Sequence, residues 1–128
     1  MKTRLIIAFI LAMSGFAAAP PLFAHHASAG YDMEHPVTRK GVVTSMEWTN
    51  PHVFIFMDVK DDNGNTEQWR VEGNSPNMLL RVGWKKEMIK PGDVLEVHCA
   101  PAKNGSKFFR LISLTLPNGQ KLDGQGFK

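Results

Sequence analysis

Hydrophobic and polar positions alternate along much of the chain after residue 36, which is the pattern typical of β-strands. In His52–Lys60 every second residue is aliphatic or methionine, as a strand with one buried face requires: Val53, Ile55, Met57 and Val59. Four further stretches have strand composition: Val37–Trp48, Thr66–Glu72, Val94–Ala100 and Lys107–Leu116. The pattern therefore predicts five strands.

Turn sequences separate these strands. Asn63-Gly64 between the second and third strands is a strong hairpin signal, and Asn104-Gly105 lies between the fourth and fifth. Ser75 followed by Pro76 is typical of a helix start and predicts a short helix over Asn77–Leu80. Five strands with one short helix between the third and fourth predict a mainly β fold, a small OB-like barrel. A five- or six-stranded sandwich has the same order of elements and stays the alternative.

Residues 1–24 have the features of a cleavable secretory signal peptide. Two basic residues precede the apolar run Leu5–Phe16, which is shorter than the roughly 20 residues that span a bilayer. Cleavage after Ala24 would release a chain that begins at His25. Cleavage after Ala29 fits the small-x-small rule better and would discard both histidines of the His-His pair. The residue pattern alone leaves the two open.

Length and charge add little that is specific to one function. We expect an extended arm over residues 25–36 and a single domain over residues 37–128. Two of the fifteen basic residues fall in the expected signal peptide, so the remaining thirteen nearly balance the twelve acidic ones. This balance argues against nucleic-acid binding, which needs a concentrated basic face. No second apolar run follows, so we expect no membrane span after cleavage and a periplasmic or secreted location in a Gram-negative bacterium.

The histidines near the expected mature terminus are candidate metal ligands. With cleavage after Ala24, His25 would offer its α-amine and its ring to one ion, and nitrogen-rich sites of this kind suit Cu(II). His52 is the expected partner because the turn before it would place it at the barrel rim, and His26 and His35 are available to assist. In the plainer interpretation, His25 and His26 are ordinary polar residues.

Two other possible metal sites fail on their spacing. His98 and Cys99 are neighbours in a predicted strand and so point to opposite faces, which makes Cys99 a small core residue. The stretch from Asp61 to Glu72 partly matches a calcium-binding loop, but Thr66 stands where that loop requires glycine. We interpret this stretch as a hairpin turn.

Aromatic side chains on the first three strands are candidate ligand-binding residues. Trp48, Phe54, Phe56 and Trp69, with Asn50 in the adjoining turn, would bind a sugar or a partner protein if they gather on one face. The alternative is that these rings close the core. No serine lies in a nucleophile-elbow context, and no acid pair is apparent, so we do not expect an enzyme. Copper-dependent redox chemistry is conceivable, but the short chain offers no extended substrate platform.

Several separated motifs resemble a bacterial family of secreted proteins of unknown function, whose members start their mature part with His-His. They are His25-His26-Ala27-Ser28, Pro36–Thr44, Glu47-Trp48-Thr49-Asn50-Pro51-His52, Asn74–Asn77, Leu80–Trp84, Lys90–Asp93 and Leu116–Leu122. The resemblance implies cleavage between Ala24 and His25. It departs from the family at Ala27-Ser28, where Ser-Phe is usual. It implies no activity.

The sequence thus predicts a periplasmic OB-like binding module with a Cu(II) site at His25 and His52, assisted by His26 or His35. The alternative prediction is a metal-free interaction domain that holds a sugar or a partner protein through its aromatic face or a sheet edge.

Overall fold

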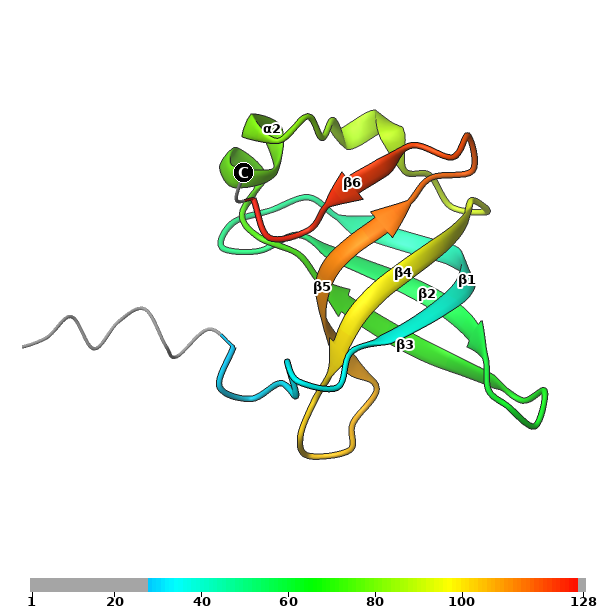
Figure 1. Cartoon of the computed structure of the whole chain (residues 1–128). Coiled ribbons are helices and arrows are strands. Elements are labelled where there is room, and N and C mark those ends of the chain that lie inside the picture. The colour runs from blue at the N-terminus through cyan, green and yellow to red at the C-terminus, as the bar shows by residue number, and fades with distance from the viewer. Residues whose placement is uncertain (1–27, 127–128) are drawn as a thin grey trace, which may run out of the picture.

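The computed structural model describes residues 28–126, in which six β-strands and two short helical segments form (Figure 1). Their bounds are β1 Val37–Glu47, β2 Phe54–Lys60, β3 Thr66–Glu72, α2 Pro76–Arg81, η1 Lys86–Met88 (a 3-10 helix), β4 Val94–Pro101, β5 Phe108–Thr115 and β6 Lys121–Asp123. The predicted signal peptide, residues 1–24, lies outside the described residues, and so do the candidate ligands His25 and His26. Within them, no helix is long and apolar enough to cross a membrane.

The first five strands close into a barrel. Antiparallel pairing gives the order β3-β2-β1-β4-β5, and a parallel pairing of Arg70–Glu72 with Phe108–Arg110 joins β3 to β5. The predicted mainly β, OB-like barrel is confirmed, with one short helix between β3 and β4. Closure by the β3–β5 pairing excludes the two-sheet sandwich. The short β6 extends the sheet at the outer edge of β5.

The period-two pattern explains which side chains fill the barrel. On β2 the apolar face of Ile55, Met57 and Val59 is buried. Trp69 of β3 stacks on Phe109 of β5 inside the barrel, with ring centroids 3.7 Å apart. One end of the barrel is covered by α2 and η1, and the β2–β3 and β4–β5 loops lie at the other end (Figure 1). The interior is therefore a packed core.

Turn chemistry accounts for the element boundaries. Ser75 caps α2 by accepting a hydrogen bond from the backbone N–H of Met78, and Gly83, at φ +96°, follows its end. The second strand begins at Phe54 rather than at His52, because Val53 pairs instead with the chain after β3: its N–H donates to the carbonyl of Asn74. Neither η1 nor β6 was predicted, since each is only three residues long.

The described part of the N-terminal arm lies against the β4–β5 hairpin. Tyr31 forms an isolated bridge with Ala102, and the Asp32 N–H donates to the carbonyl of Pro101 over 2.8 Å. The Lys103 N–H donates to the carbonyl of Gly30 over 2.9 Å. These backbone contacts hold the arm in place from residue 30 onward.

Candidate functional site

A carboxylate at the end of β3 joins the arm to the β1–β2 turn. Glu72 Oε2 accepts a hydrogen bond of 2.6 Å from the Tyr31 hydroxyl. Its other oxygen, Oε1, lies 2.5 Å from Nδ1 of His52. The Glu72 side chain is only 14% exposed. One carboxylate thus contacts two residues that are 21 positions apart in the chain.

A buried arginine supports this carboxylate from the neighbouring strand. Arg110 lies opposite Glu72 in the parallel β3–β5 pairing, and its Nη1 is 3.7 Å from Glu72 Oε1. The same Nη1 donates to the carbonyl of Gly73 over 2.9 Å, and Arg110 is 8% exposed. Because buried charges need partners, the charges of Glu72 and Arg110 stabilise each other.

The environment of Tyr31 changes its ionisation. Burial raises the pKa of Tyr31 to about 12, and the hydrogen bond to Glu72 and the negative charge of Glu72 act in the same direction. The positive charges of Arg110 and Arg70 oppose the increase. Tyr31 is therefore held as the neutral phenol that donates to Glu72.

The contact with Glu72 orients the ring of His52. A carboxylate can only accept, so the shared proton lies on Nδ1 of His52. In a neutral ring, Nε2 then carries the lone pair that a metal ion binds, and a carboxylate behind a histidine is the usual arrangement at metal sites. The His52 side chain is 31% exposed, so part of the ring is accessible from solvent.

The other described candidate, His35, lies in a different setting. Its side chain is 78% exposed, and its Nδ1 lies 3.0 Å from Asp32 Oδ2. The hydrogen bond with His35 is the main cause that lowers the pKa of Asp32. Within residues 28–126 no group of three or more His, Cys, Asp or Glu side chains is arranged to hold a metal ion. Among the described residues, the imidazoles of His52 and His35 are each oriented by a carboxylate, but they do not form part of a complete metal site.

The structure does not bring the four candidate aromatic residues to one surface. Trp69 is buried inside the barrel, while Trp48 packs against the core near Trp84, with ring centroids 6.4 Å apart. Phe54 and Phe56 alone lie half-buried on the outer face of β2. The remaining candidate, Asn50, is exposed in the turn before β2, where its peptide bond to Pro51 is cis.

The outer face of β2 continues onto two residues that the sequence analysis did not single out. The guanidinium carbon of Arg70 lies 3.9 Å from the ring centroid of Phe54 and 5.2 Å from that of Phe108. A sequence signal for Arg70 existed: Trp69 and Val71 beside it are apolar, so the alternation of a strand places Arg70 on the outer face. Phe108 could not be found this way, because the β3–β5 pairing that brings it there is not visible in the sequence.

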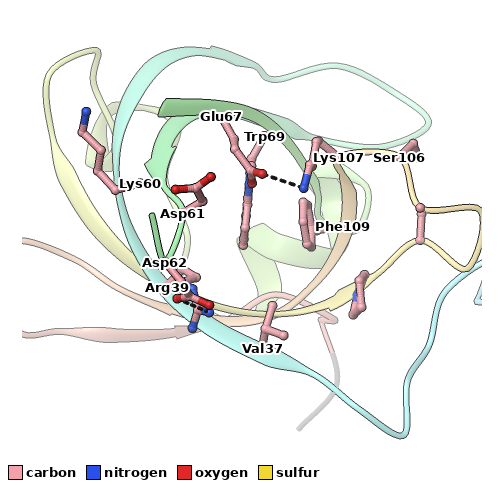
Figure 2. A pocket seen from close by; sticks show the side chains of 13 residues that line it. Val37, Arg39, Lys60, Asp61, Asp62, Glu67, Trp69, Ser106, Lys107 and Phe109 are labelled. Carbon is pink, nitrogen blue, oxygen red and sulfur yellow. Dashed lines mark hydrogen bonds and ion pairs between the residues drawn. The ribbon is translucent and has the colours of Figure 1, made fainter. Parts of the chain in front are cut away.

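A hollow of about 300 Å³ lies at the end of the barrel opposite α2 and η1 (Figure 2). Lys107 Nζ is 2.7 Å from Glu67 Oε1, and the Trp69 indole N–H donates to Glu67 Oε2 over 2.9 Å. The hydrogen bond with Lys107 is the main cause that lowers the pKa of Glu67. Across the opening, Arg39 pairs with Asp62 over 3.3 Å. Four of the charged groups that line the hollow are thus paired with one another, while Lys60 and Asp61 line it as well.

The sequence patterns that were set aside have structural roles. Asp61 Oδ1 accepts hydrogen bonds from the N–H groups of Asn63 and Asn65, which closes the β2–β3 hairpin. Cys99 is fully buried, and desolvation raises the pKa of its thiol to about 12. Its neighbour His98 faces outward and contacts the hydroxyl of Thr38.

Residues 13–109 match a family of unknown function, DUF6152. The protein belongs to this family. The region matched to DUF6152 contains Tyr31, His52, Arg70 and Glu72. Arg110 and β6 lie beyond it. No curated protein matches the chain at a significant level. The description of DUF6152 assigns no activity, so function has to be argued from the residues.

Proposed function

We propose that this domain is an exported binding module, rather than an enzyme, that holds one Cu(II) ion between a mature N-terminal His25 and His52. The observation that supports the proposal is the carboxylate of Glu72, which contacts both Tyr31 of the arm and His52 of the β1–β2 turn. The arm is thereby held next to His52, whose carboxylate partner Glu72 is only 14% exposed, whereas the Asp32 partner of His35 is 37% exposed.

Chain length is compatible with this pairing. Residues 28–31 form a turn, in which the Tyr31 N–H donates to the carbonyl of Ser28 over 3.0 Å. The three residues from His25 to Ser28 span about 10 Å when extended. Through the Glu72 carboxylate, Nε2 of His52 lies within roughly 10 Å of the Tyr31 hydroxyl, from the two contacts and standard bond lengths. The span from His25 to Ser28 and the distance from the Tyr31 hydroxyl to His52 are thus of the same order, and the pairing requires that the turn directs residues 25–27 toward His52.

The donor set suits copper. An N-terminal histidine binds through its α-amine and its ring, and the amine, with an ordinary pKa of about 8, loses its proton readily to a metal ion. Adding Nε2 of His52 gives three nitrogens, and Cu(II) favours tetragonal nitrogen sites and has the highest affinity of the common divalent ions. His26 is available as a further donor, and His35 would have to leave Asp32 to serve as one.

A Cu(II) titration tests the proposal. The chain that begins at His25 is titrated by calorimetry and by electron paramagnetic resonance, beside a chain with one extra alanine before His25. We expect one-to-one binding with a nitrogen-rich spectrum. The extra alanine should weaken it by at least about tenfold, because the amine and the ring then no longer belong to the same residue. His52→Gln should weaken it similarly and Glu72→Gln by about tenfold, since such supporting residues typically contribute 10–100-fold.

Matched controls separate this site from ordinary histidine binding. His98→Gln removes a histidine of β4 that contacts Thr38, and it should leave the affinity unchanged. Equal affinity with and without the extra alanine contradicts the proposal. So does an exported protein whose first residue, determined by N-terminal sequencing, is Gly30, since both histidines of the pair are then lost.

A second candidate function needs no metal. Phe54 and Phe56 lie on the outer face of β2, and Phe108 beside them is 46% exposed, which favours a module that binds a sugar or a partner protein there. Nuclear magnetic resonance of the labelled protein with a panel of soluble sugars is the test. Shifts confined to this face and lost in Phe56→Ala would support it. Shifts scattered over the barrel would contradict it.

A further inference from the structure

Arg70 is held in an unusual way on the outer face of the barrel. Its register partners are Phe56 on β2 and Phe108 on β5. The guanidinium lies over the ring of Phe54 and near that of Phe108, and its Nε is buried with no hydrogen-bond partner among the described residues. Contact with aromatic rings occupies the faces of a guanidinium and leaves the N–H groups at its edge for another partner.

The positive charge of Arg70 is not paired with a carboxylate of the described residues. None of the ion pairs found within residues 28–126 includes Arg70. The carboxylate two residues along the strand, Glu72, already contacts Tyr31, His52 and Arg110. Glu72 is therefore engaged by other groups, and the charge of Arg70 has no ion-pair partner among residues 28–126, although Asp58 is a half-buried carboxylate on the same face of β2.

Two hollows open on either side of the same pair of residues, Arg70 and Phe108. The smaller, about 110 Å³, is bordered by Tyr31, Phe54 and Glu72. The larger, about 350 Å³, is lined by rings, aliphatic atoms and short polar groups from β1, β2 and β3, among them Thr44, Ser45, Phe56 and Gln68. Small-molecule sites are typically hollows of this size, mostly apolar with a few polar groups that fix orientation.

We infer that this face binds a small organic acid through its carboxylate, with the planar edge of Arg70 paired to the two oxygens and an apolar tail lying over Phe108 and Phe56. Arginine matches the plane and spacing of a carboxylate and binds it with two parallel hydrogen bonds. The ligand supplies an acceptor for the terminal N–H groups of Arg70, since the Nε itself is buried, and a counter-charge that Glu72, which contacts other groups, does not supply. The inference does not depend on the copper site, because it uses none of the proposed copper ligands.

The test compares phenylacetate with phenylacetamide, which has the same ring and no charge. Each is titrated into the nitrogen-15-labelled protein with a chelator present, and the Nε–H signal of Arg70 is followed by nuclear magnetic resonance. We expect the acid to shift this signal and to bind at least about tenfold more tightly than the amide, as charge-assisted hydrogen bonds to a carboxylate imply. A short peptide ending in phenylalanine, with a free or an amidated C-terminus, distinguishes a peptide terminus from a free acid as the source of the carboxylate.

Two variants complete the test. Arg70→Gln should abolish the preference for acid over amide, and urea unfolding in parallel verifies that the variant is folded. Arg39→Gln removes the same charge at the barrel mouth, where Arg39 pairs with Asp62, and should leave the preference intact. Equal binding of acid and amide overturns the inference. It is also overturned if Arg70→Gln keeps the preference, or if neither the acid nor the free peptide shifts Arg70 at millimolar concentration.

Discussion

Tyr31 is the only tyrosine of the chain, so its ionisation is a direct measure of how the arm is held. Its pKa, raised to about 12, depends first on burial and then on the hydrogen bond to Glu72 and the charge of Glu72. Glu72→Gln keeps a hydrogen-bond acceptor for Tyr31 and removes the charge. We therefore expect the pKa of Tyr31 to fall toward 10, and the charges of Arg70 and Arg110, no longer opposed, strengthen the fall.

The same shift predicts how stability changes with pH. The folded state binds the phenolic proton more tightly than the unfolded state, so the stabilisation is fully present below pH 10 and is lost as pH rises from 10 to about 12. A difference of this size corresponds to about 2.7 kcal/mol. Because Tyr31 is half-buried and its charge interactions are screened by water, we expect about 1–2 kcal/mol of the free energy of unfolding to be lost.

The pKa of Tyr31 is measured from the absorbance of the tyrosinate band. The absorbance is recorded milliseconds after a pH jump, so that the protein is still folded. Glu67→Gln is the matched control, since Glu67 is a half-buried glutamate of the same strand that contacts Trp69 and Lys107 instead. The control should leave the titration of Tyr31 unchanged. A wild-type midpoint near 10 would refute the burial of Tyr31 against Glu72. The same midpoint in wild type and Glu72→Gln would refute the contribution of the Glu72 charge.

Two further predictions concern the core. In Gly124→Ala the new Cβ would clash with Cγ of the buried Leu111, and urea unfolding should show a loss of about 1–3 kcal/mol in the free energy of unfolding. An unchanged midpoint would mean that this contact relaxes at no cost. The thiol of Cys99 is fully buried with a pKa of about 12, so a thiol reagent at neutral pH should label it only at the rate of unfolding. Rapid labelling of the folded protein would contradict its burial.

The strands could be predicted because their pattern is local. In β2, every second side chain is buried, and a period of two along the chain is enough to recognise a strand and its inner face. The helix start was equally local: Ser75 and Pro76 act on backbone groups within one turn. The ends of the strands were predicted less exactly. Val53, for example, was placed in the second strand, but it bonds to the chain after β3 instead of continuing the β1–β2 ladder.

The candidate site could be predicted only in part. His52 was recognised from its place after a turn, but nothing in the sequence connects it with Glu72 or Tyr31. Those contacts exist because the arm lies along the β4–β5 hairpin and because β3 and β5 pair in parallel. The same closure places Trp69 inside the barrel against Phe109, although its residue type alone also suited a binding surface.

The sequence by itself determined five of the six strands, the helix position and the inner faces of β2 and β4, since these follow from the spacing of apolar residues and from turn chemistry within a few positions. Only the tertiary structure decided which outward side chains become neighbours. The physical reason is that barrel closure joins segments far apart in the chain: Arg70 meets Phe108, and Tyr31 meets Glu72, through backbone pairings that local propensity does not specify.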